Sequence, residues 1–190
     1  MVLILLTQPK IHYIFMLDDM IGKRWDYAKS GCLGCMLQIQ KNKNARVSFI
    51  IFNHSARTVI NCESVNLGEM EKKIQLNCGG TDFDKAFQEA YHLIIQHQND
   101  AFEKTEILFY TDGSDSYPKY SVQLFKELPE HQKNRIFLHC SSEESDAIVL
   151  QMIVNELNAS LIKSELIQKI QVTELQKTWV EVVSREYITY

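Results

Sequence analysis

Several sequence patterns that identify common functional classes are missing from this chain of 190 residues. No stretch reaches the length of a membrane-spanning helix, about 18 consecutive apolar residues, so we expect no membrane span. The 20 basic residues are outnumbered by 24 acidic ones and form no basic stripe with interleaved aromatics, so we expect no nucleic-acid binding. The glycine-rich phosphate-binding patterns and the HExxH zinc pattern are also missing.

The chain also lacks the cysteine pattern of a disulfide-stabilised domain. Its five cysteines are odd in number, and a chain of this length needs no covalent framework to fold. We therefore expect free thiols in a reducing setting, either the cytoplasm or another intracellular compartment. Cys32 and Cys35 have the spacing of a redox or zinc pair, but they lie inside a predicted helix without a second pair, which favours packing in the core.

Apolar runs alternate with amphipathic segments along the sequence. The runs predicted as strands are residues 11–17, 47–52, 58–62, 107–110 and 135–139. The segments predicted as helices are residues 24–40, 83–97, 120–128, 144–158 and 170–184. Residues 63–76 show no clear pattern.

This alternation predicts an α/β fold of the doubly wound, Rossmann-like kind. The central sheet is expected to be mostly parallel, with helices on both faces. The short turn between the second and third strands predicts a hairpin, which adds one antiparallel strand at an edge. Residues 1–10 are expected to be an N-terminal extension or an extra strand, because they lack a basic segment and a cleavage site, and residues 11–190 form the domain.

Acidic and hydroxyl side chains gather in three loops of this predicted fold. In such a sheet, ligands bind outside the carboxyl ends of the strands, so the loops after Leu17 and Tyr110 and the loop before Phe83 converge there. Carboxylates and hydroxyls that meet at one point suit Mg²⁺, which prefers oxygen ligands. The polar residues of these loops are Asp18, Asp19, Thr81, Asp82, Thr111, Asp112, Ser114 and Asp115.

The sequences of these loops resemble those of the von Willebrand factor A family. Phe-Met-Leu-Asp at residues 15–18, Gly-Gly-Thr-Asp at residues 79–82 and Phe-Tyr-Thr-Asp-Gly at residues 109–113 match its three loops in order and separation. The likeness extends over residues 11–184. It implies a metal-ion-dependent adhesion site, in which an Asp-x-Ser-x-Ser loop, a threonine and a further aspartate hold Mg²⁺ and a partner's carboxylate completes the shell.

Asp18, Thr81 and Asp112 match the first aspartate, the threonine and the last aspartate of that site, and Asp19 is a possible stand-in ligand. The two serines do not carry over. Without a gap, Met20 and Gly22 occupy their positions, and with a gap the serine segment is deleted. Two hydroxyl ligands are absent in both alignments, and a methionine thioether is a poor ligand for Mg²⁺.

Two alternatives follow for this degenerate site. Mg²⁺ is held more weakly by Asp18, Asp19, Thr81 and Asp112, or no metal binds and Lys23 or Arg24 neutralises the aspartates. The expected partner-binding rim consists of Met20, Gly22, Gly80, Asp82, Gly113 and Ser114.

By this resemblance, the function expected is that of a non-catalytic protein–protein interaction module, a scaffold or subunit of a larger assembly whose partner is another protein. The sequence shows no nucleophile with its base and orienting group. One alternative is a working Mg²⁺-dependent ligand-binding domain. Another is a metal-assisted hydrolase that uses Asp18, Asp19 and Asp112. A phosphotransfer site would need a lysine after residues 135–139, and Cys-Ser-Ser-Glu-Glu follows there instead.

Overall fold

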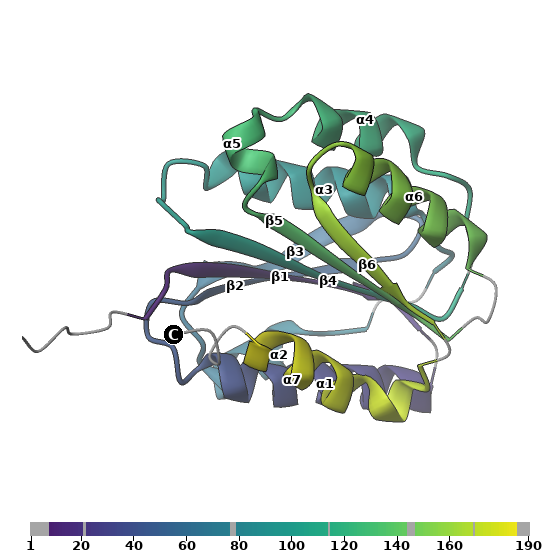
Figure 1. Ribbon diagram of the computed structural model, residues 1–190. Coiled ribbons are helices and arrows are strands. Elements are labelled where there is room, and N and C mark those ends of the chain that lie inside the picture. Colours follow the sequence, from purple (N-terminus) through teal and green to yellow (C-terminus); the bar gives the residue numbers. More distant parts are fainter. Residues whose placement is uncertain are drawn as a thin grey trace, which may run out of the picture.

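The computed structural model describes residues 8–20, 22–76, 79–113, 115–143, 147–168 and 170–185. Within them, a six-stranded sheet lies between two layers of helices (Figure 1). The strands are β1 (Ile11–Asp18), β2 (Arg46–Phe52), β3 (Ala56–Glu63), β4 (Lys104–Thr111), β5 (Ile136–Ser142) and β6 (Lys163–Ile167). The helices are α1 (Lys23–Ile39), α2 (Leu67–Lys73), α3 (Phe83–Gln96), α4 (Lys119–Glu127), α5 (Glu130–Lys133), α6 (Ile148–Ala159) and α7 (Leu175–Arg185), with a 3₁₀ turn at Val172–Glu174.

The order of the strands across the sheet is β3-β2-β1-β4-β5-β6, and only the β2–β3 pair is antiparallel. From β1 the chain proceeds to β2 and β3 on one side, and it then returns to place β4, β5 and β6 on the other. The order therefore reverses between β1 and β4. At such a reversal the loops that follow the two strands diverge to opposite faces and leave a crevice at the carboxyl edge, which is the usual ligand site of this architecture.

Strand β1 is buried on both faces, and its alternating side chains point into two separate cores. Phe15 and Leu17 face one side, where they pack with α1 and α7, while Ile14 and Met16 face α3 and α6. In Figure 1 the helices α1, α2 and α7 lie below the sheet, and α3, α4, α5 and α6 lie above it. Burial of each such side chain stabilises the folded state by roughly 1.5–3 kcal/mol. The two cores therefore hold β1 and β4 in place beneath the crevice.

The predicted fold class is confirmed, including the single antiparallel strand at the edge. Each of the five predicted strands and five predicted helices is present, with ends that differ by a few residues. The last helix begins at Leu175, later than expected, because a 3₁₀ turn precedes it. Residues 1–7 and 144–146 lie outside the described residues, and so does the expected extension except for its last three residues.

The prediction omitted β6, α2 and α5. Strand β6 has only five residues, all at least partly exposed, so it lacks the apolar run of the central strands. Helix α2 buries only Met70, although Asn66 caps its first turn through a bond from the Glu69 amide. None of the helices in the described residues is both long enough and apolar enough to span a bilayer.

Candidate functional site

The three predicted loops converge on a cavity of about 300 Å³ at the carboxyl edge of the sheet. Asp18 ends β1, Asp112 follows β4, and Thr81 precedes α3. Because β1 and β4 are neighbouring parallel strands, their carboxyl ends bring these side chains to the same point. The cavity is lined by Asp18, Asp19, Met20, Arg24, Gly79, Thr81 and Asp112.

Asp18 is the buried centre of the site, with 3% of its surface exposed. Its Oδ2 atom accepts hydrogen bonds from Thr111 Oγ1 at 2.5 Å and from Thr81 Oγ1 at 3.3 Å. Burial raises the pKa of Asp18 to about 7, the two hydroxyl bonds oppose this rise, and the negative charge of Asp112 adds to it. The carboxyl group therefore carries an ionisation cost that a nearby positive charge would relieve.

Arg24 brings a positive charge to the mouth of the cavity. Its Nη1 atom lies 2.8 Å from Asp112 Oδ2, and its Nη2 atom lies 3.4 Å from Glu143 Oε2. The backbone turns at Gly22 with a φ of 72°, a conformation that favours glycine, and α1 starts at the next residue. This turn places the first residues of α1 beside the cavity. The Arg24 side chain is 56% exposed, so the pairs contribute little to stability, but the guanidinium remains accessible to a partner.

Glu143 is a site residue that the sequence analysis missed. It follows β5, and its Oε1 atom accepts hydrogen bonds from Tyr110 Oη at 3.0 Å and from the Val172 amide at 3.1 Å. A carboxylate that follows a strand at the same edge of the sheet is a signal in the sequence that could have identified it.

Two of the predicted site aspartates have structural partners. Asp19 is buried, and its Oδ2 atom accepts a hydrogen bond from Asn53 Nδ2 at 3.2 Å, which ties the loop after β1 to the end of β2. Asp82 caps α3 by accepting a hydrogen bond from the Lys85 amide at 2.9 Å. A third aspartate, Asp115, accepts a bond from the Phe83 amide at 2.7 Å and so joins the loop after β4 to the start of α3.

The predicted rim is only partly at the surface. Gly22 and Gly80 are exposed, and Gly113 is half-buried close to Thr81. Met20 lines the cavity but is 3% exposed and packs with the core, so it offers little surface to a partner. Ser114 lies outside the described residues.

The side chains in this arrangement fit Mg²⁺ poorly. This ion needs a nearly octahedral shell of oxygen atoms. Here Asp18 Oδ2 is already engaged by two hydroxyls, and Asp112 is paired with Arg24. Met20 brings no oxygen in its side chain, and the guanidinium of Arg24 would repel a second cation. Among the described residues, the implied metal therefore lacks ligands on the side where the two serines are missing.

The Cys32 and Cys35 pair lies elsewhere, on the buried face of α1. Burial raises the pKa of both thiols, so each stays protonated at neutral pH. Both pack in the core between α1 and the sheet, which supports the interpretation of these cysteines as core residues.

The sequence matches no protein-family model and no curated protein. Solved structures of similar fold are nevertheless found. The PilB minor pilin from Streptococcus sanguinis is 12% identical, with a TM-score of 0.77 over 98% of this chain and 63% of the pilin. A von Willebrand factor type A protein from Catenulispora acidiphila is also 12% identical, with a TM-score of 0.69 over 94% of this chain and 43% of that protein.

The SpRpn10 VWA domain is 15% identical, with a TM-score of 0.63 over 90% of this chain and 95% of the domain. The chain thus spans nearly all of this isolated domain but less than two thirds of the pilin. Identities this low establish the fold alone. With the strand order and the converging loops, they show that the chain has a von Willebrand factor A-like fold.

Proposed function

We propose that this chain is a non-catalytic protein-interaction module that binds another protein of a larger assembly through the carboxyl edge of its sheet. In this proposal Arg24 takes the place of the metal ion of an adhesion site. The observation that carries it is the contact between Arg24 Nη1 and Asp112 Oδ2, which puts a fixed cation beside an aspartate expected to hold a metal.

The chemistry of Arg24 suits recognition of an acidic group on the partner. A guanidinium carries five N–H donors, and the contacts with Asp112 and Glu143 engage only part of them. The remaining donors lie on a side chain that is 56% exposed. An aspartate, a glutamate or a chain-terminal carboxylate of the partner would pair with them in a charge-assisted contact.

The residues that line the cavity support a binding role over catalysis. Among the described residues they offer carboxylates, one threonine, a thioether and Arg24, but no cysteine, histidine or lysine. Of the carboxylates, Asp19 and Asp112 are engaged by Asn53 and Arg24. The raised pKa of Asp18 would suit a general acid, but its Oδ2 atom already accepts two hydroxyl bonds from the protein itself. A Mg²⁺-dependent version of the module would place a second cation at Asp112 beside Arg24.

An intracellular setting is part of this proposal. The described cysteines Cys32, Cys35, Cys62 and Cys140 are all free, in keeping with a reducing compartment.

Affinity capture from the source cells would test the proposal with three forms of the full chain: wild type, Arg24→Glu and Lys43→Glu. Lys43 is an exposed basic residue before β2, at the opposite edge of the sheet, so its reversal controls for the change in net charge. We expect one protein to be retained by the wild type and by Lys43→Glu, equally in Mg²⁺ and in EDTA, and to be lost with Arg24→Glu. Retention by Arg24→Glu, or loss in EDTA, would contradict the proposal.

A further inference from the structure

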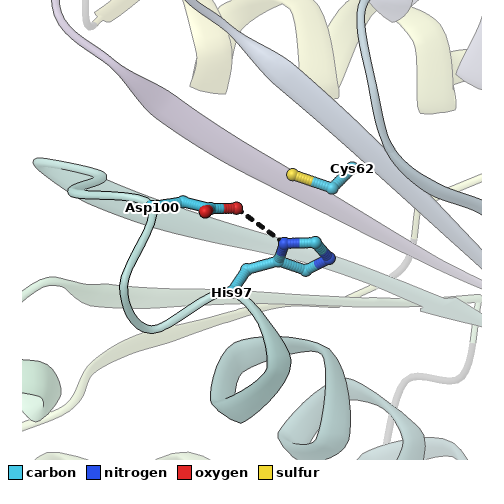
Figure 2. A group of neighbouring side chains, drawn as sticks. All are labelled: Cys62, His97 and Asp100. Atoms are coloured by element: carbon cyan, nitrogen blue, oxygen red, sulfur yellow. Dashed lines mark hydrogen bonds and ion pairs between the residues drawn. The ribbon is translucent and has the colours of Figure 1, made fainter.

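A second group of polar side chains lies at the amino edge of the sheet, away from the Arg24 cavity. Cys62 comes from the end of β3, His97 directly follows α3, and Asp100 lies in the turn after it (Figure 2). One ligand atom from each, a sulfur, a nitrogen and an oxygen, lies within 4.8 Å of the others. Figure 2 shows the three side chains directed toward one common space.

A bulge in β3 presents Cys62 to this space. The register between β2 and β3 shifts so that Asn61 and Cys62 together lie opposite Ser48. Cys62 has a φ of 53°, an unusual conformation for a residue with a side chain, and its amide donates a hydrogen bond to Ser48 Oγ at 2.9 Å. Such strain persists only where the surroundings enforce it, and it gathers at functional positions.

His97 has an oxygen atom close to each of its ring nitrogens. Asp100 Oδ2 lies 2.7 Å from Nδ1, and Asn61 Oδ1 lies 2.7 Å from Nε2. A neutral imidazole carries one proton and donates only one hydrogen bond. If Nε2 donates to Asn61, the lone pair of Nδ1 faces a carboxylate oxygen, and a cation bound by both atoms, with the two moved apart to roughly 3.3 Å, would relieve this repulsion. Without a metal, a ring protonated at Nδ1 would donate to Asp100, and the Asn61 amide in its flipped orientation would donate to Nε2.

We propose that Cys62, His97 and Asp100 form a zinc-binding site. Zn²⁺ accepts thiolate, imidazole and carboxylate ligands in a tetrahedral arrangement, and three protein ligands leave the fourth position to water. Binding displaces the proton of the Cys62 thiol to solvent and leaves the thiolate, Nδ1 of His97 and one Asp100 oxygen on the ion. The mixed set of sulfur, nitrogen and oxygen favours Zn²⁺ over Mg²⁺, which prefers oxygen alone.

Asn61 is the positioning residue of this site. When Asn61 Oδ1 accepts a hydrogen bond from Nε2–H, it fixes the tautomer in which Nδ1 is free to ligate, as acceptors behind metal-bound histidines do. The neighbouring His12 is not a further ligand, because its Nε2 atom contacts Ser48 Oγ at 2.8 Å and its ring stacks on Phe102.

The site is accessible from solvent. The side chains of His97 and Asp100 are 16% and 46% exposed, and Cys62 is half-buried. Zinc can therefore enter the folded protein without local unfolding. Because the site and the Arg24 cavity lie at opposite edges of the sheet, either proposal can fail without the other.

The test is a titration of the purified full chain with Zn²⁺ alone, followed by calorimetry, and with Co²⁺ as a spectroscopic substitute. We expect one ion per chain, a thiolate-to-cobalt charge-transfer band and the visible bands of tetrahedral Co²⁺. Cys62→Ser should abolish the charge-transfer band, and Asp100→Asn, at an exposed position, should weaken Zn²⁺ binding at least about tenfold.

Two further variants separate ligation from general metal adsorption. Asn61→Ala should weaken Zn²⁺ binding about 10–100-fold while leaving the charge-transfer band in place, because it orients a ligand but is not one. His92→Gln, which removes an exposed histidine of the same helix, should leave binding unchanged. The proposal is wrong if Co²⁺ gives no charge-transfer band, or if Cys62→Ser and Asp100→Asn bind Zn²⁺ as the wild type does.

Discussion

The substitution Asp18→Asn should stabilise the protein, and by more as the pH rises. The cause is the buried carboxyl group, whose pKa is raised from 3.8 to about 7 in the folded state. Between these two values the unfolded chain has released a proton that the folded chain still binds, so the free energy of unfolding falls as the pH rises through this window and levels off above it. Asparagine keeps an acceptor for Thr81 and Thr111 but never ionises.

The size of the effect follows from the change in the pKa of Asp18. About three pKa units at 1.36 kcal/mol each lower the free energy of unfolding by about 4 kcal/mol at a pH above the folded pKa. About 2–3 kcal/mol of this loss develops between about pH 5 and about pH 8. Urea unfolding of both proteins across this range, in a chelator, measures the difference. Asp26→Asn, at an exposed position of α1, controls for the removal of a carboxylate. A difference that stays constant with pH, or shrinks as the pH rises, would refute the reasoning.

Two further substitutions test the packing and charge of the core. Burial alone would lower the pKa of His139, but its hydrogen bonds to Glu106 and Glu165 outweigh burial and raise the pKa to about 9. The stability that the charged His139 contributes is therefore complete below pH 6.5 and is lost toward pH 9. His139→Gln should thus destabilise the protein less as the pH rises, and urea unfolding should show the difference shrink by roughly 3 kcal/mol over that window. Phe109→Ala should cost about 3–5 kcal/mol by the same assay, because its ring stacks on the rings of Phe52 and Phe87 in the core between the sheet and α3. A loss below about 1 kcal/mol would show that the core refills the space.

The sequence predicted the fold well because the elements that define it are strongly patterned. The apolar run of β1 ends at Asp18, and the apolar stripe of α3 begins after its cap at Asp82, so both elements are visible locally. Strand β6 has no such pattern. It is held by its packing against α6 and by its pairing with β5 on the far side of α6 in the chain, and a pattern within its own residues indicates neither contact.

The candidate site was predictable in its position but only partly in its contacts. Ligands of such sheets bind at the carboxyl edge, and this rule is enough to bring Asp18, Thr81 and Asp112 together from the sequence alone. Either Lys23 or Arg24 was a candidate to neutralise the aspartates, and the turn at Gly22 places Arg24 against Asp112. The zinc ligands could not be foreseen, because their meeting depends on a bulge in β3 that the sequence pattern does not indicate.

The most direct test of the central claim, that Arg24 replaces the metal ion, is the melting temperature of the wild type and of Arg24→Gln with and without millimolar Mg²⁺. We predict no change for the wild type and a small rise for Arg24→Gln, because the guanidinium no longer opposes Mg²⁺ beside Asp112 while the missing serine ligands keep the binding weak. A clear Mg²⁺-dependent rise for the wild type, equal to or larger than that of Arg24→Gln, would contradict the claim.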